Sequence, residues 1–309
     1  MPFRVNPIGI MQGRLSPPMP GRLQAFPRGT WQQEFERARA IGFDCLEWVF
    51  EADEYEQNPL WRESGVKKIL ELQTRHQVAV KTVCADYFMI HPLFRGLAAE
   101  RSRSVAVLQR LIEQASRIGT KVILIPVLEE AEIQSRSELE QLAESVGECL
   151  PLARAGNLRL GLEAELPGEE YLQLIDFLHS PQVCVYYDTG NNAARAHDLG
   201  QDIRLLGSRI GGMHLKDRKR GGGSVMLGTG DADFGAVLEA LRAVAYRGPL
   251  ILQPAFGADF LGDARRNLDF IRAFLYATSR PHDPRALKFS DPAFHSVVGP
   301  TILKSGGKC

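Results

Sequence analysis

The chain has little cysteine, and none of it is arranged for disulfides or for a cysteine-based metal site. Its five cysteines in 309 residues include no Cys-x-x-Cys pair, and several lie in apolar stretches typical of buried strands. Disulfide-stabilised secreted proteins and zinc-thiolate sites both require paired or clustered cysteines. We therefore expect reduced, buried cysteines in an intracellular, cytoplasmic protein.

Long apolar runs and an excess of one charge are also missing. No apolar stretch approaches the roughly 18 residues of a membrane-spanning helix, and the opening MPFRVNPIGIMQGRL lacks a signal-peptide core. Lys plus Arg and Asp plus Glu number 37 each, so no net field attracts nucleic acid or anionic lipid. Hydrophobic residues make up 44% of the chain, which is enough for a large core. These features predict a globular protein that binds neither nucleic acid nor a membrane.

A glycine-rich nucleotide-binding fingerprint is absent after the first predicted strand, where the sequence reads GIMQGRL. What recurs instead is an amphipathic helix, a glycine and a short apolar strand, as in FERARAIGFDCLEWVF and LIEQASRIGTKVILIPV. Glycine after a helix supplies the left-handed conformation that ends it. Helix starts are indicated by Asp233 and by the capping-box spacing of Thr30 with Gln33 and of Ser137 with Glu140.

The predicted strands are almost continuously apolar, as parallel strands covered on both faces must be. There are eight: Ile8–Gln12, Asp44–Val49, Ala79–Ala85, Lys121–Val127, Arg159–Glu163, Val183–Tyr187, Ile210–Leu215 and Pro249–Gln253. A (β/α)8 TIM barrel over residues 1–278 is favoured over a doubly wound open sheet, because the count reaches eight without a second domain. Residues 279–309 lose periodicity and gain Pro, Gly and Ser, which predicts a short C-terminal extension, irregular or partly disordered.

Polar residues stand where the strands end, and catalytic residues of a barrel collect at the C-terminal strand ends. A lone Asp there is usually a cap, and a lone His is usually a core residue. Glu163, Asp188 and His214, however, each interrupt an apolar run on consecutive strands. Together they predict a site for one divalent cation, such as Mn²⁺, Mg²⁺, Co²⁺ or Zn²⁺, to which Gln253 could add a neutral oxygen. Glu165 competes with Glu163 but lies nearer to solvent.

Eight motifs along the chain resemble those of the xylose-isomerase-like TIM barrels, and within them the sugar phosphate isomerase/epimerase group: IGIMQGRL, LEWVFEADE, VCADYFMIHPL, LEAELP, YYDTGN, HLKDR, LGTGDADF and ILQ. The resemblance runs from Ile8 to Ala277. It implies a metal-dependent isomerase or epimerase of carbohydrate metabolism, acting on a sugar, a sugar phosphate or a related polyol ketone. The metal ligands that it implies are Glu163, Asp188, His214 and Gln253.

The chain departs from the resemblance at two positions. Characterised ketose epimerases carry a glutamate where this chain has Gln253, and they tend to carry a histidine where it has Asn191. Because a glutamine cannot act as a general base, Glu163 is the leading candidate for proton abstraction. A second proton carrier would have to come from Glu47, Asp86 or Glu129. Asp86 is favoured because it directly follows a buried strand, whereas Glu129 begins the acidic run EEAE.

The residues expected to contact substrate at the rim are Gln12, Arg14, Glu47, Lys216 and Arg218. Arg14 follows the first strand in a short loop, and Lys216 shares a strand face with His214, so both are candidates for binding an anionic group. Glu47 could equally be a structural partner of Arg14. The basic segment KDRKRGGGS is interpreted either as a flexible lid or as a solvated loop.

Two other classes of function stay open. One is dehydration of a polyol ketone or phosphodiester hydrolysis on the same scaffold, and the other is a ligand-binding barrel without catalysis. Hydrolysis at DNA lesions normally requires a histidine-rich cluster of several metals, and only one of the chain's seven histidines belongs to the predicted site. The expected partner is a small carbohydrate substrate, and pairing into a homo-oligomer through surface helices is left open.

Overall fold

The computed structural model describes residues 6–22 and 24–278. Its barrel strands are β1 (Ile8–Met11), β2 (Cys45–Val49), β3 (Ala79–Cys84), β4 (Val122–Pro126), β5 (Arg159–Glu163), β6 (Val183–Asp188), β7 (Ile210–Leu215) and β10 (Leu250–Leu252). They form a closed barrel in the order β1-β10-β7-β6-β5-β4-β3-β2, and the pairs are parallel. The TIM-barrel prediction is confirmed. The predicted extension, residues 279–309, lies outside the described residues.

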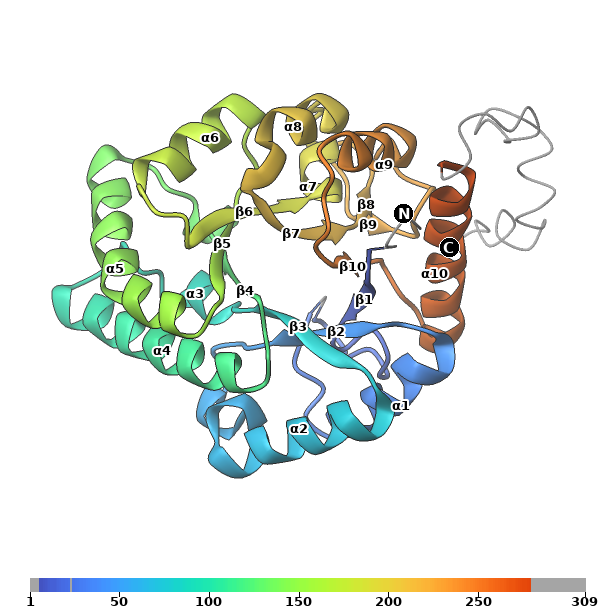
Figure 1. Cartoon of the computed structure of the whole chain (residues 1–309), viewed down its shortest axis with the longest axis horizontal. Helices are drawn as coiled ribbons and strands as arrows, with labels where there is room; N and C mark the ends of the chain where they lie inside the picture. Colours follow the sequence, from blue (N-terminus) through green and yellow to red (C-terminus); the bar gives the residue numbers. More distant parts are fainter. Residues whose placement is uncertain (1–5, 23, 279–309) are drawn as a thin grey trace.

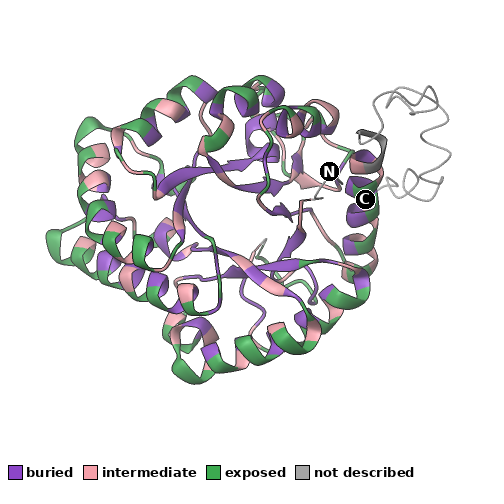
Figure 2. Ribbon diagram, viewed as in Figure 1, coloured by how far each residue is buried: buried purple, intermediate pink, exposed green. Residues whose placement is uncertain are grey.

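Helices surround the strands on the outside (Figure 1). They are α1 (Trp31–Ile41), α2 (Glu63–His76), α3 (Tyr87–Ile90), α4 (Ala98–Arg117), α5 (Arg136–Ala155), α6 (Gly168–Phe177), α7 (Thr189–Ala194), α8 (Leu199–Leu206), α9 (Phe234–Ala243) and α10 (Phe260–Thr278). Single 3₁₀ turns lie at residues 55–57, 59–61, 129–131 and 207–209. The strands and the helix faces against them are buried, whereas the outer helix faces are exposed (Figure 2).

The strand boundaries predicted from the apolar runs differ from the observed ones by at most one residue at either end. Helix caps were harder to predict. Asp233 caps α9 as expected, because its Oδ1 accepts from the N–H of Ala236 at 2.9 Å. Ser137 is the wrong cap, since α5 begins two residues earlier and Ser135 Oγ accepts from the N–H of Glu138 at 3.2 Å. Thr30 precedes α1 without a side-chain cap.

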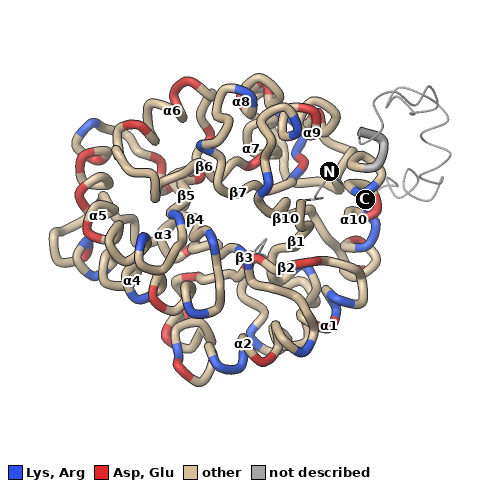
Figure 3. Tube along the Cα trace, viewed as in Figure 1, with Lys and Arg blue, Asp and Glu red and all other residues tan. Residues whose placement is uncertain are grey.

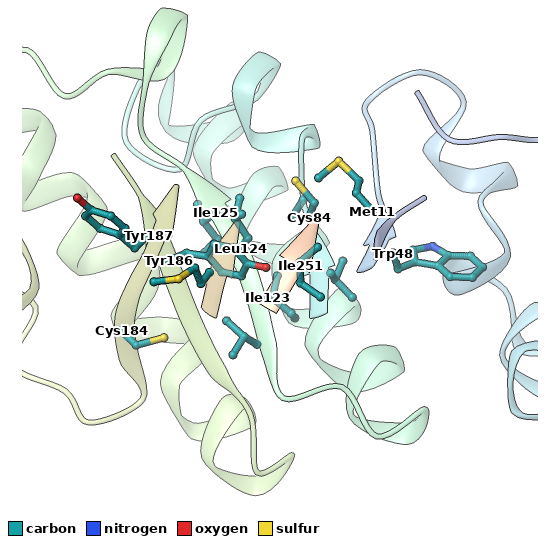
Figure 4. Packing of buried hydrophobic residues seen from close by; sticks show 14 of the residues in the cluster. Met11, Trp48, Cys84, Ile123, Leu124, Ile125, Cys184, Tyr186, Tyr187 and Ile251 are labelled. Atoms are coloured by element: carbon teal, nitrogen blue, oxygen red, sulfur yellow. The ribbon is translucent and has the colours of Figure 1, made fainter. Parts of the chain in front are cut away.

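The barrel interior below the mouth is filled by Tyr186, whose side chain points inward in Figure 4. Its ring packs against a glycine on each neighbouring strand, most closely against Gly212. A Cβ at Gly212 would lie 2.2 Å from Tyr186 Cε2, and one at Gly161 would lie 3.1 Å from Tyr186 Cδ2. Contacts below about 3 Å are not tolerated in close-packed interiors. The two glycines therefore allow a large aromatic residue to form the floor of the mouth.

Four of the five cysteines lie within the described residues, and all four are free and buried: Cys45, Cys84, Cys149 and Cys184. This agrees with the expectation of buried, reduced cysteines. Within the described ranges, no helix combines the length and apolar character needed to cross a bilayer.

Candidate metal centre

Three side chains at the C-terminal ends of neighbouring strands form one cluster. Glu163 ends β5, Asp188 ends β6 and His214 lies one residue before the end of β7. One potential ligand atom from each lies within 4.8 Å of the other two. His214 Nδ1 is 3.7 Å from Glu163 Oε1 and 3.6 Å from Asp188 Oδ2. All three residues are buried. The structure thus brings together three of the four predicted ligands.

Two atoms of this cluster have no hydrogen-bond partner among the described residues. They are Asp188 Oδ2 and His214 Nδ1, both buried. A buried polar atom left without a hydrogen bond costs about 1–3 kcal/mol, and for Asp188 Oδ2 the charge of Lys216 Nζ at 3.6 Å offsets part of that cost. Carboxylate oxygens together with an imidazole nitrogen suit Mn²⁺, Mg²⁺, Co²⁺ or Zn²⁺. The donor set therefore fits a divalent cation.

Glu47 contacts the ring nitrogen of His214 that points away from the two carboxylates. His214 Nε2 contacts Glu47 Oε1, and Glu47 Oε2 accepts from the hydroxyl of Tyr186. This arrangement places a proton on Nε2 and directs Nδ1 towards the two carboxylates. Burial alone would lower the pKa of His214, but the charge of Glu47 and the contacts with Asp188 and Glu163 raise it well above its ordinary value. A positive charge at Nδ1, whether a proton or a cation, is thus strongly favoured.

The two carboxylates of the cluster have different environments. Burial raises the pKa of Glu163, and contact with His214 offsets only part of this effect. Asp188 is equally buried, yet the charge of Lys216 and the contact with His214 bring its pKa below the ordinary value. Its Oδ1 also accepts from the N–H of Asn191 at 2.7 Å. Two neighbouring carboxyl groups whose pKa values are shifted in opposite directions are typical of sites that transfer protons.

Asn191, at the position where a histidine is common in the resembling enzymes, connects the cluster to two cations. Its amide nitrogen donates to Glu163 Oε1 at 3.3 Å. Its amide oxygen accepts from Lys216 Nζ and from an Arg218 guanidinium nitrogen, both at 3.0 Å. Lys216 and Arg218 thus lie beside the cluster. A neutral amide keeps them in place without adding charge.

Gln253 follows β10 directly, and its side chain belongs to a polar chain across the mouth. Gln253 Nε2 donates to Gln24 Oε1 at 2.8 Å, and Gln24 Nε2 donates to Asp86 Oδ2. Gln253 Oε1 is buried and has no hydrogen-bond partner among the described residues. Asp86 is partly exposed, and burial raises its pKa. Gln24, on the loop after β1, was missed because that loop has no periodic pattern.

The remaining predicted rim residues lie deeper than expected. Glu47 is fully buried and directs both oxygens to His214 and Tyr186, so its observed contacts are with the chain. Gln12 is also fully buried, with its Oε1 accepting from the N–H of Val49 at 3.0 Å. Arg14 is buried too. Its Nε donates to the carbonyl of Pro254 at 3.0 Å, and burial lowers its pKa to about 10.

Glu129 and Glu165 lie outside the cluster. Both line a cavity of about 900 Å³ between the loops that follow β4 and β5, and Glu163 is not among its lining residues. Glu165 pairs with Arg195 at 2.7 Å. The structure therefore places Glu163, not Glu165, beside Asp188 and His214. Glu129 is separated from them as well.

The segment interpreted as a lid or a solvated loop forms a short hairpin. Strand β8 (Asp217–Arg218) pairs antiparallel with β9 (Ser224–Val225). Asp217 holds the following loop, because its carboxylate accepts from the N–H groups of Gly228, Gly230 and Ala232. This role of Asp217, which accepts hydrogen bonds from three backbone N–H groups, could not be recognised from the sequence.

Comparison with known proteins supports the fold and the family. The family model described as xylose isomerase-like TIM barrel matches residues 35–274. A protein of Escherichia coli (strain K12), whose name proposes L-ribulose-5-phosphate 3-epimerase activity, is 23% identical over 240 residues, covering 72% of this chain and 83% of the relative.

Solved structures agree in fold. An L-ribulose 3-epimerase superposes with a TM-score of 0.72 at 18% identity, covering 91% of this chain and 100% of that chain. D-psicose 3-epimerase with D-tagatose from Clostridium cellulolyticum H10 gives a TM-score of 0.69 at 18% identity, covering 87% of this chain and 99% of that chain. The matched family model spans most of the barrel, and the resemblance inferred from the motifs is confirmed. The chain belongs to the xylose isomerase-like TIM barrel family.

Proposed function

We propose that the protein is a divalent-metal-dependent epimerase or isomerase of a sugar, a sugar phosphate or a related polyol ketone. The observation that supports this most is the buried convergence of Glu163, Asp188 and His214, in which Asp188 Oδ2 and His214 Nδ1 lie 3.6 Å apart and have no hydrogen-bond partner among the described residues. The epimerase names of the relatives support the reaction class.

The metal ligands in this proposal are Glu163, Asp188, His214 and Gln253. A divalent cation held there supplies Lewis acidity that eases the loss of a proton beside a carbonyl. Gln253 contributes its unpaired Oε1, and its Nε2 is already engaged by Gln24. A neutral ligand leaves the site one negative charge short of a version with glutamate. A cation at this site would be held less tightly and would be a stronger Lewis acid.

Glu163 is the proposed base that takes the proton from the carbon next to the carbonyl. Its carboxylate is oriented by Asn191, which donates to Oε1 at 3.3 Å. The side chain is 9% exposed, so water is largely kept from the proton-transfer step. General-base catalysis requires a carboxylate in a fixed position, and Glu163 meets this requirement in a site that is largely shielded from water.

Asp86 is the proposed second proton carrier. Gln253 cannot exchange a proton. Its side chain is linked through Gln24 to Asp86, so a carboxyl group still lies on the β10 side of the mouth. Asp86 returns a proton to the face opposite Glu163, which inverts the carbon. The two carboxyl groups then exchange protons with solvent and regain their starting states.

The predicted rim residues Gln12, Arg14, Glu47, Lys216 and Arg218 divide into two groups, of which only Lys216 and Arg218 are proposed to contact substrate. Lys216 and Arg218 meet at Asn191 Oδ1 and would bind hydroxyl groups or an anionic group. Glu47 acts through His214 as a positioning residue, and Gln12 and Arg14 shape the mouth through backbone contacts with Val49 and Pro254. The substrate is a small carbohydrate that spans the mouth between these cations and Glu163.

A screen of free and phosphorylated ketoses, with Mn²⁺, Co²⁺, Mg²⁺ or Zn²⁺ added, tests the proposal. We expect an epimer or isomer of at least one ketose, detected by chromatography. Glu163→Gln should lower the rate by about 10²–10⁴-fold. The control is Glu169→Gln, which changes an exposed carboxylate at the start of α6, and it should remain active.

Two outcomes would contradict the proposal. Undiminished turnover by Glu163→Gln would place the base elsewhere, and a product lighter by one water would indicate a dehydratase.

The role of Asp86 has its own test, because Asp86→Asn should still exchange the substrate proton with solvent while forming little epimer. Equal loss of exchange and of epimer formation would show that Asp86 has another role.

A further inference from the structure

A cavity at the end of the barrel opposite to the candidate metal centre is lined by positive charge. We call it the basal cavity. It has a volume of about 530 Å³ and lies where strands begin, as its lining residues Pro7, Gly211 and Pro249 show. Five cationic residues line it: Lys81, Lys121, Arg154, Arg159 and Arg247. Its described lining residues include no carboxylate. Figure 3 shows Lys and Arg segments interspersed with Asp and Glu segments along the outer helices.

The backbone of β3, β4 and β5 brings three of these cations together. The N–H of Lys121 donates to the carbonyl of Lys81 at 2.8 Å, and the N–H of Arg159 donates to the carbonyl of Lys121 at 2.9 Å. Lys81 is also the extra residue of a bulge. The register of β2 with β3 passes from Val80 to Thr82 and leaves Lys81 without a partner on β2. Bulges commonly redirect a side chain.

None of the five cations forms an ion pair with a carboxylate in the part of the chain that the structure describes. Arg159 donates only a long hydrogen bond of 3.4 Å to the carbonyl of Arg209, and its Nε is buried with no partner among the described residues. Arg247 donates to the carbonyl of Tyr246 at 3.1 Å. Clustered like charges repel one another, and a bound anion relieves that repulsion. The chain as a whole has no net charge, so the positive charge at this cavity is a local excess.

We infer that the basal cavity binds a small polyanion that carries two or more phosphate groups. Its volume lies within the range of small-molecule sites, roughly 300–1,000 Å³. Guanidinium groups such as those of Arg154 and Arg159 match phosphate with paired hydrogen bonds, and lysines add point charges. A single monophosphate would leave most of the five charges uncompensated, which favours a diphosphate or triphosphate group. The site is separate from the carbohydrate chemistry at the mouth.

Titration calorimetry of the full chain, without added divalent metal, tests this inference. The probes are inorganic phosphate, pyrophosphate and tripolyphosphate. We expect affinity to increase in that order and to fall as NaCl is raised. The double variant Lys121→Ala/Arg154→Ala should weaken tripolyphosphate binding at least tenfold, because charge-assisted hydrogen bonds are lost. Both residues are exposed at the rim of the cavity, so the fold should persist.

Arg39→Ala is the matched control, because it removes an exposed cation on α1, away from the cavity, and should leave binding unchanged. Sugar turnover should survive in the double variant, which separates this site from the proposed function. Should the double variant fail to fold, Arg247→Ala gives the same comparison at one exposed position.

Several results would overturn the inference. They are no binding of any probe, equal weakening by Arg39→Ala, or loss of binding in the mouth variant Lys216→Met instead. A further such result is that a single-stranded oligonucleotide binds more tightly than tripolyphosphate and that the double variant loses this binding. The cavity would then be part of a nucleic-acid surface and not a small-molecule site.

Discussion

At the scale of single residues, the contact between Glu47 and His214 determines how well the proposed metal centre is organised. Glu47→Gln removes the negative charge behind the imidazole and weakens the preference for a proton on Nε2. Such supporting partners typically contribute 10–100-fold to metal affinity. We therefore expect Mn²⁺ or Co²⁺ to bind Glu47→Gln about 10–100-fold more weakly, measured by competition with a chelating dye. Unchanged affinity would show that Glu47 does not act through His214.

Glu34, on α1, gives a pH-dependent prediction away from the metal centre. Its Oε1 accepts from the N–H groups of Gly13 and Leu15 and from the hydroxyl of Ser16, and burial raises its pKa from 4.5 to about 7. Between these two values the folded protein binds a proton that the unfolded chain has released. The free energy of unfolding therefore falls as the pH rises through this window, by about 3 kcal/mol in total.

Glu34→Gln stays neutral at every pH but can keep the three donors on its oxygen. Relative to wild type, it should become more stable as the pH rises from 5 to 8, measured by urea unfolding. Glu36→Gln, on the exposed face of the same helix, should show no such trend. A constant difference between Glu34→Gln and wild type would contradict the raised pKa.

The residues that the sequence revealed are those that interrupt an apolar strand. Glu163, Asp188 and His214 could be predicted because each is the first polar residue of a buried run. Tyr186 carried a weaker signal, because it precedes Asp188 by two and so shares its face. Gln24 could not be found, since its two partners lie 62 and 229 residues away in the sequence.

At the scale of elements, Gly212 on β7 makes room for the aromatic floor of the mouth. Gly212→Ala would place a Cβ 2.2 Å from the Tyr186 ring, so we expect a loss of about 1–3 kcal/mol or more in unfolding free energy. Gly147→Ala is the control, because nothing lies within 4 Å of the added Cβ in α5, and alanine should stabilise that helix by up to about 1 kcal/mol. Equal stability of both variants in chemical denaturation would argue against the packing described here.

Strands were predictable to within one residue, whereas the segments between them were not. Parallel strands buried on both faces must be apolar throughout, and this is a local property of the sequence. The β8–β9 hairpin depends instead on Asp217 accepting from backbone groups up to 15 residues away. Contacts of this kind depend on where the chain folds back, so composition and periodicity do not indicate them.

At the scale of the whole molecule, metal binding should be coupled to stability. A ligand that binds only the folded state adds about 2.7 kcal/mol at a concentration of 100 Kd, which raises the Tm by several degrees. We expect Mn²⁺ or Co²⁺ to raise the Tm and a chelator to reverse the effect. Asp188→Asn should abolish the increase, while the control Asp176→Asn, at an exposed ion pair with Arg209, should retain it. An increase that persists in Asp188→Asn would place the metal elsewhere.

Removal of a proton next to the carbonyl of a ketose by Glu163 is the step on which the proposed function depends. Solvent deuterium incorporation at a single carbon, followed by NMR in D₂O with metal present, measures this step directly. We expect incorporation by wild type and by the control Glu169→Gln, and none above background by Glu163→Gln. Incorporation by Glu163→Gln at the wild-type rate, or epimer formation without any deuterium in the product, would show that Glu163 is not the base.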